Sequence, residues 1–303
     1  MLSISHSTNS SARITAIPLS SIPAVNVATV PQRSPLRYPG GKTWLVPHIR
    51  AWLGNQDAQP EVIVEPFAGG GIVSLTAVME GLAQRCVMAE IDREVAAFWK
   101  AALDHSDALI AEIRQFSPTR RRIEEIAEQS PTGVLERGFR ALALNRTRRG
   151  GILAAGASLS RSGENGKGLA SRWYPETLAK RLRAIAEYAG QIEFHETDGM
   201  ELLEGMLSSC VKGETVVFAD PPYTAGGKRA GSRLYNHNVI DHQRLFAMLA
   251  DSEVNFLMTY DESPEIVTLV AKHHFSAVRV IMKNTHHARL SELVITPQPV
   301  FLR

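Results

Sequence analysis

The stretch that decides the fold is "EVIVEPFAGGGIVSLTAVMEGL", residues 61–82. It begins with an apolar run of strand length and ends with a run of helical period. The three glycines between the two runs, residues 69–71, allow a tight turn and a close approach of the backbone to a ligand. A strand, a glycine-rich turn and a helix in this order predict a βα unit whose ligand crevice lies at the carboxyl end of the strand.

The alternation of strand-length and helix-length runs continues on both sides of this unit. It predicts an α/β fold with a doubly wound, mostly parallel sheet, in which residues 34–104 and 191–303 form the sheet domain. Residues 105–190 are expected to form an inserted, mainly helical domain. Strands are predicted at 61–67, 85–91, 191–197, 214–220, 255–261, 276–282 and 292–302, and helices at 72–82, 93–103, 241–250 and 263–274.

Residues 1–33 hold no Asp or Glu and are rich in Ser, Thr and small residues, which predicts a flexible tail. A transit peptide is the alternative, although the segment lacks an Arg-rich amphipathic helix. No apolar run reaches the roughly 18 residues of a membrane span. Cys86 and Cys210 are too few for a disulfide framework or a structural zinc site. We therefore expect a cytoplasmic protein without a metal or a membrane partner.

Charge is distributed unevenly along the chain. Residues 114–183 hold 15 Lys or Arg against 6 Asp or Glu, whereas the remainder holds 18 against 25. A basic segment within an otherwise acidic chain indicates a polyanionic partner bound at one place. The alternative, solvated helix faces, fits the run 120–122 best, and it fits residues 137–172 less well because Glu164 is the one acid there.

Acidic residues lie at the end of the second predicted strand. Glu90 and Asp92 come about 20 residues after the glycine turn, a spacing at which an acid binds the hydroxyls of a ribose. The glycine spacing departs from GxGxxG, so a structural turn with Asp92 as a helix cap is the alternative. Upstream, Gly41 and Lys42 precede a further predicted helix at 43–53, where Lys42 is placed to hold a carboxylate.

The stretch "VVFADPPYTAGGKR", residues 216–229, ends a buried strand on Asp220, two prolines and Tyr223. Pro221 and Pro222 have no N–H, so the Asp220 side chain and the carbonyls beside it form a cluster of acceptors. Such a cluster suits a substrate amine, and Tyr223 offers a flat face for a planar ring. The alternative is a turn with a packing tyrosine.

Six motifs occur in one order along the chain: "PLRYPGGK", "VEPFAGGGIVSL", "AEID", "LNRTRRGGI", "TDGME" and "DPPY". Together they resemble the Dam-like, alpha-group DNA adenine methyltransferases over residues 35 to about 297. The resemblance implies a Rossmann-like methyltransferase sheet, S-adenosylmethionine as the methyl donor, and the exocyclic amine of a flipped adenine in double-stranded DNA as the acceptor.

Site residues are carried over by position in these motifs. The resemblance implies a catalytic set of Asp220, Pro221, Pro222 and Tyr223. Glu90 matches the ribose-binding acid, which is more often Asp in the family, and Asp198 the acceptor for the cofactor's adenine amine. The implied cofactor-binding set is Tyr38, Gly41, Lys42, Glu65, Phe67, Gly69, Gly71, Glu90, Asp198, Gly199 and Asp220.

The insertion matches the family's target-recognition region, in agreement with its surplus of basic residues. The family often has an aromatic residue after "NRT", whereas this chain has two arginines, which favours phosphate contact over base contact. The predicted DNA-binding set is Asn145, Arg146, Arg148, Arg149, Arg161, Lys167, Lys228, Arg229 and Arg233.

Three other functions remain open from the residues. One is methyl transfer to another amine, in cytosine, RNA or a protein glutamine. Another is a catalytically silent DNA-binding module of the same fold, and the last is a dinucleotide oxidoreductase, which the broken glycine spacing disfavours. A monomer is expected, with a restriction endonuclease as a functional partner.

Overall fold

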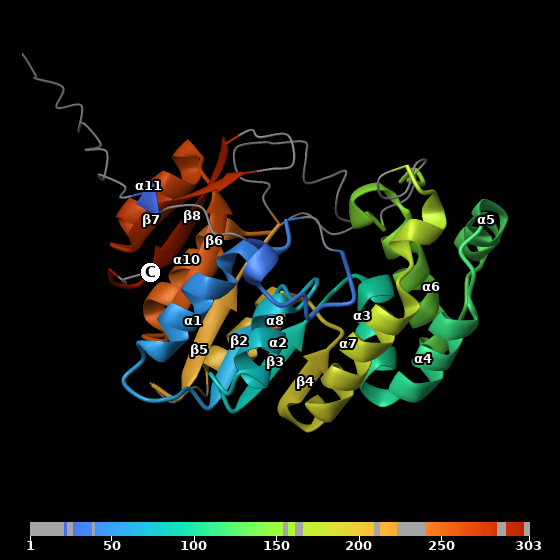
Figure 1. Ribbon diagram of the computed structural model, residues 1–303. Coiled ribbons are helices and arrows are strands. Elements are labelled where there is room, and N and C mark those ends of the chain that lie inside the picture. The colour runs from blue at the N-terminus through green and yellow to red at the C-terminus, as the bar shows by residue number, and fades with distance from the viewer. Residues whose placement is uncertain are drawn as a thin grey trace, which may run out of the picture.

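A computed structural model describes residues 21–22, 27–37, 40–153, 157–160, 166–208, 213–222, 240–283 and 289–299 of the chain. Its centre is a sheet of eight strands in the order β1-β7-β8-β6-β5-β2-β3-β4. Figure 1 shows the sheet with helices on its faces and the helices α4 to α7 grouped at the end near β4.

The strands are β1 (Ser21–Ile22), β2 (Val62–Glu65), β3 (Arg85–Ala89), β4 (Ile192–His195), β5 (Thr215–Ala219), β6 (Asn255–Asp261), β7 (Ser276–Lys283) and β8 (Arg289–Thr296). Strands β2 to β8 overlap the seven predicted apolar runs, and β1 is an addition to them. The doubly wound α/β prediction is confirmed. The antiparallel pairing of β8 with both β6 and β7 is an addition that the apolar runs did not predict.

Helices connect these strands. In the sheet domain they are α1 (Val46–Gly54), α2 (Ile72–Met79), α3 (Arg93–Asp104), α8 (Gly199–Leu207), α10 (His242–Asp251) and α11 (Pro264–Lys272). In the insertion they are α4 (Ser106–Gln115), α5 (Arg120–Glu128), α6 (Val134–Thr147) and α7 (Pro175–Glu187).

Strand order reverses at β2, which pairs in parallel with β3 on one side and with β5 on the other. Ligands of open α/β sheets bind in the crevice at such a switch point, at the carboxyl ends of the strands. The order therefore places the residues after β2, β3 and β5 around one crevice.

The strands at this point are buried on both faces, which explains why they are apolar throughout rather than alternating. Successive residues belong to opposite cores: Ile63 and Phe218 pack into one cluster, and Val64 and Val217 into the other. Helices α1, α2, α3 and α7 contribute to the first cluster, and α8, α10 and α11 to the second.

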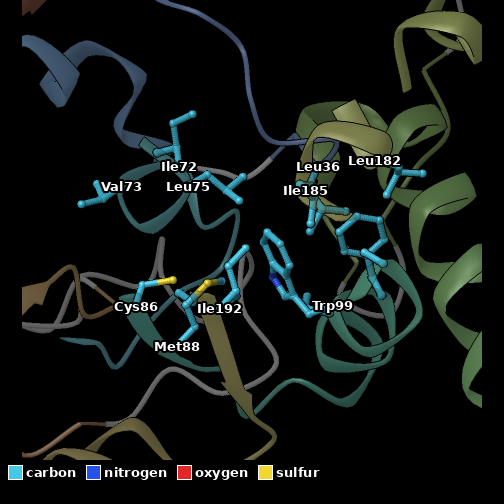
Figure 2. Packing of buried hydrophobic residues seen from close by; sticks show 14 of the residues in the cluster. Leu36, Ile72, Val73, Leu75, Cys86, Met88, Trp99, Leu182, Ile185 and Ile192 are labelled. Atoms are coloured by element: carbon cyan, nitrogen blue, oxygen red, sulfur yellow. The ribbon is translucent and has the colours of Figure 1, made fainter. Parts of the chain in front are cut away.

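The inserted helices share the first cluster with the sheet domain. Trp99 of α3 lies in that cluster, and Figure 2 shows it among side chains from β3 and from α7, including Met88, Leu182 and Ile185. The insertion is thus packed onto the sheet domain through one continuous core. The domain boundaries at 104 and 190 stay a prediction.

Packed structure begins before residue 34, so the prediction of a flexible tail through residue 33 is wrong for its described part. Residues 21–22 add a parallel strand to the edge of β7. Val30 is buried in the first cluster, and Arg33 forms an ion pair with Glu80 at 2.6 Å. Across the described part of the chain, no helix has both the length and the hydropathy needed to cross a membrane.

Gly71 is the residue at which the glycine turn becomes helix α2. Its φ of +61° is a left-handed value, and an added Cβ atom would lie 2.6 Å from Cζ2 of Trp99. We predict that Gly71→Ala lowers the free energy of unfolding by about 3 kcal/mol, because strain and overpacking add.

Gly81→Ala is the matched control, since Gly81 has a similar φ of +63° but nothing within 4 Å of an added Cβ. We expect a loss of about 1 kcal/mol there, measured by urea denaturation. Equal losses for the two variants would contradict the packing of the turn against Trp99.

Candidate active site

The carboxyl ends of β2, β3, β4 and β5 surround one cavity of about 870 Å³. This volume lies within the range of small-molecule sites, about 300–1,000 Å³. Residues predicted from separate motifs meet in its lining: Gly41, Lys42, Glu65, Phe67, Gly71, Glu90, Asp198, Gly199, Asp220, Pro221 and Pro222.

The glycine turn is fixed from two sides. The indole N–H of Trp99 donates to the carbonyl of Gly69 at 2.9 Å, and the N–H of Gly69 donates to Oε2 of Glu90 at 3.1 Å. Oε2 of Glu65 accepts from the N–H of Ser74 in the first turn of α2 at 2.9 Å. Gly69 is not among the residues that line the cavity. Its backbone hydrogen bonds instead fix the shape of the turn beside the cavity.

Two carboxyl groups in the cavity have raised pKa values. Burial raises the pKa of Glu65 to about 8 and that of Glu90 to about 7. Glu65 is therefore mainly protonated at pH 7. Because both values exceed the ordinary 4.5, the contribution of these groups to stability is present below pH 4.5 and is lost as the pH rises to about 8.

Asp220, directly after β5, is held by two donors. Nζ of Lys42 lies 2.9 Å from its Oδ2, and Oγ1 of Thr259 on β6 donates to its Oδ1 at 2.7 Å. Nζ of Lys42 also lies 3.4 Å from Oε2 of Glu292 on β8 and donates to the carbonyl of Gly40 at 2.7 Å. Lys42, which was expected to hold a carboxylate of the cofactor, therefore contacts Asp220, the predicted catalytic residue.

The Lys42 ammonium is only 3% exposed. Burial, the largest single effect, lowers its pKa, but the charges and hydrogen bonds of Asp220 and Glu292 more than offset burial and raise the pKa above its usual value. Lys42 is therefore charged at neutral pH.

Asp198 and Gly199 begin helix α8 at the cavity. Oδ1 of Asp198 accepts from the N–H of Met200 at 2.7 Å, which caps the helix. An added Cβ at Gly199 would lie 2.0 Å from the carbonyl oxygen of Pro66, so the glycine lets α8 approach the turn after β2. The predicted contact of Asp198 with a cofactor amine stays a prediction.

Asn145 fastens the basic insertion to the segment before Lys42. Its Oδ1 accepts from the N–H of Arg37 at 2.7 Å, and its Nδ2 donates to the carbonyls of Arg37 at 2.9 Å and Gly151 at 2.8 Å. Gly151, with a φ of +75°, packs so closely that a Cβ would meet the Arg37 carbonyl oxygen at 2.0 Å. With 1% of its surface exposed, Asn145 holds these two segments together, and direct DNA contact does not fit its position.

Arg146 is also internal, at 6% exposure. It donates from Nε and Nη2 to the carbonyl of Arg172, at 3.1 and 3.0 Å, and lies over the ring of Tyr174. Arg148 is partly buried and donates to the carbonyl of Leu153 at 2.9 Å. Both arginine side chains therefore hold backbone segments of the insertion in place.

Arg149 and Lys167 are both exposed residues of the insertion. They are the described members of the predicted DNA-binding set whose side chains face solvent. Tyr38, Arg161, Tyr223, Lys228, Arg229 and Arg233 lie outside the described residues, and their roles stay predictions.

Sequence reasoning missed Trp99, Thr259 and Glu292. The pairing of Ala219 with Met258 puts the next residue of β6, Thr259, beside Asp220. A polar residue inside an apolar strand was the available signal for both Thr259 and Glu292. Its meaning depends on the strand order, which the sequence pattern does not fix.

The cavity has the chemistry of a site for a cationic ligand that carries a ribose. Acidic residues lie at or just after the ends of four neighbouring strands, and Glu90 directly follows β3, the strand next to the glycine turn. This lining fits S-adenosylmethionine, which has a positively charged sulfur and two ribose hydroxyls. A fold and a cavity of this kind define an S-adenosylmethionine-dependent methyltransferase.

The model of the D12 class N6 adenine-specific DNA methyltransferase family matches residues 38–285. The chain belongs to this family, and its cofactor is S-adenosylmethionine. The comparison with curated proteins gives no match.

Solved structures similar to this chain include two methyltransferases. The S-adenosylmethionine-dependent methyltransferase from Agrobacterium tumefaciens has 10% identity and a TM-score of 0.41, with coverage of 85% of this chain and 62% of that one. The rRNA methyltransferase aviRa from Streptomyces viridochromogenes has 16% identity, a TM-score of 0.38, and coverage of 82% of each chain.

The hydrogen bond from Thr259 to Asp220 gives a prediction at this site. Thr259→Val keeps the shape of the side chain and removes the donor, so Asp220 is less well oriented. We expect kcat to fall about 10-fold, the equivalent of about 1.4 kcal/mol, with unchanged affinity for S-adenosylmethionine.

Thr296→Val is the control, because Thr296 is a buried threonine on β8 whose hydroxyl donates to the carbonyl of Gln298. Its kcat should stay within twofold of the wild type. A Thr259→Val enzyme as active as this control would contradict the orienting role of the hydroxyl.

Proposed function

We propose that the protein is a site-specific DNA adenine methyltransferase that transfers a methyl group from S-adenosylmethionine to the exocyclic amine of a flipped adenine in double-stranded DNA. The observation that carries the proposal is the position of Asp220, a hydrogen-bond acceptor at the wall of the cavity and at the carboxyl end of β5. An adenine amine has two N–H donors and no charge, which suits this acceptor and the carbonyls beside it.

Orientation is the main task of the protein in this reaction. When bound, S-adenosylmethionine supplies a methyl group already activated by its attachment to a positive sulfur. Asp220 and the carbonyl of Pro221 accept the amine hydrogens and direct the nitrogen lone pair toward the methyl group. Pro221 and Pro222 present no N–H that would compete for these acceptors.

The nitrogen gains positive charge as its bond to the methyl carbon forms and the bond between that carbon and the donor sulfur breaks, which leaves the sulfur as an uncharged thioether. The nitrogen becomes neutral again when it releases a proton to water. The carboxylate of Asp220 stabilises the positive charge on the nitrogen. Flipping the adenine costs a few kcal/mol, and base stacking on Tyr223 together with the hydrogen bonds to the amine offsets this cost.

Asp220→Ala tests the acceptor. We predict that it abolishes methyl transfer to plasmid DNA, with a loss of at least about 1,000-fold, because the amine is no longer oriented and its charge is not stabilised. Tritiated-methyl incorporation measures the activity, and calorimetry should show S-adenosylmethionine bound within a few-fold of the wild-type affinity.

Asp251→Ala is the matched control, since Asp251 is an exposed acid at the end of α10. It should methylate plasmid DNA like the wild type. If Asp220→Ala retained wild-type activity, the assignment of the acceptor would be wrong.

DNA binding is assigned to the exposed basic residues of the insertion. Arg149 lies two residues after the end of α6, and Lys167 lies in the Gly- and Ser-rich loop. The hydrogen bonds of Asn145 hold this loop against Arg37, which lines the cavity. Phosphate contacts made here therefore position the duplex relative to the cavity. A monomer, a cytoplasmic location and an accompanying restriction endonuclease stay predictions.

Neutralising Arg149 and Lys167 together should weaken DNA binding without affecting cofactor binding. For Arg149→Ala/Lys167→Ala we expect the dependence of log K on log salt to flatten by about 0.9 per lost phosphate contact. Fluorescence anisotropy at several salt concentrations measures this slope.

Arg121→Ala is the control, because Arg121 is 89% exposed and pairs with Glu125 on α5. The salt slope of this variant should equal that of the wild type. An unchanged slope in the double variant as well would remove Arg149 and Lys167 from the DNA interface.

A further inference from the structure

We propose that Glu292 of β8 is a positioning residue for methyl transfer, which holds the ammonium group of Lys42 beside Asp220 and keeps the acceptor site negatively charged. The proposal rests on the proposed function, since it gives Glu292 a role in the step that Asp220 performs. None of the sequence motifs includes Glu292.

The contacts place the buried side chain of Glu292 in one charged cluster with Lys42 and the half-buried Asp220. Its side chain is 8% exposed, and its Oε2 lies 3.4 Å from Nζ of Lys42, whose distance to Oδ2 of Asp220 is 2.9 Å. Glu292 pairs with Asp261 in the β6–β8 register, so the sheet itself fixes its position. One ammonium group thus lies between two carboxylates from strands β5 and β8.

Charge balance gives the second carboxylate a function. Lys42 and Asp220 alone sum to zero, and a neutral pair would stabilise a developing positive charge poorly. With Glu292 ionised the three groups sum to a single negative charge. Glu65 does not supply this charge at pH 7, because burial raises its pKa to about 8.

Glu292 has a second effect, because it offers Lys42 an alternative partner to Asp220. The substrate amine needs the oxygen of Asp220 that Lys42 now approaches at 2.9 Å. A buried ammonium group that loses its only carboxylate is strongly destabilised. Glu292 offers a carboxylate already 3.4 Å away, so Lys42 can yield Asp220 to the amine and remain paired.

A purely structural role predicts different kinetics. If Glu292 merely allowed Lys42 to be buried, its loss would lower stability and cofactor affinity and leave the chemical step unchanged. If Glu292 keeps the site negative and releases Asp220, its loss lowers kcat and leaves the affinity for S-adenosylmethionine unchanged.

Glu292→Gln is the test, because the amide keeps the size of the side chain and removes its charge. We expect kcat on plasmid DNA to fall at least about 10-fold, with the Kd for S-adenosylmethionine within twofold of the wild type. Glu292→Asp should recover part of this loss. Glu262→Gln is the control: Glu262 pairs with Arg279 away from the cavity lining, and its loss should leave kcat within twofold.

A second measurement requires no DNA. NMR of the ¹³Cε resonance of Lys42 in the free enzyme should show a lower pKa in Glu292→Gln than in the wild type or in Glu262→Gln. An unchanged Lys42 pKa, or a kcat within twofold of the wild type, would overturn the proposal. A wild-type enzyme that does not methylate DNA would refute the proposed function, and the NMR comparison would still decide whether Glu292 holds Lys42.

Discussion

The hydrogen bond from the indole of Trp99 to the carbonyl of Gly69 is the interaction on which the arrangement of the cavity depends. It fixes the turn after β2 from one side, and Glu90 fixes it from the other. The same indole fills the space that a side chain at Gly71 would need. Because Trp99 also belongs to the core that includes the inserted helices, the cavity and the insertion have a common support (Figure 2).

Buried acids define the chemistry of the cavity. Burial raises the pKa of Glu65 to about 8 and so makes it mainly neutral at pH 7, whereas the carboxyl group of Asp220 lies 2.9 Å from the ammonium group of Lys42. The site therefore has one strong acceptor, supported by Thr259, among groups that are neutral or already paired. This division suits a neutral amine that becomes positive only during the reaction.

Periodicity predicted most of the fold, because buried parallel strands are apolar runs and the glycine turn marks the βα unit between 61 and 82. Motif position also predicted which residues line the cavity. The pairing of Lys42 with Asp220 and Glu292 was not predictable in this way, since it depends on strands β5 and β8 and on the antiparallel insertion of β8. For Asn145, motif position was misleading. The motif suggested a contact with DNA, whereas the side chain is buried in the protein interior.

Chemical identification of the methylated nucleoside tests the central claim most directly. Plasmid DNA incubated with the enzyme and S-adenosylmethionine labelled with ¹³C in the methyl group is digested to nucleosides and analysed by mass spectrometry. The account predicts labelled N6-methyladenine, absent when the Asp220→Ala enzyme is used. Labelled N4-methylcytosine, or label found in RNA and never in DNA, would contradict it.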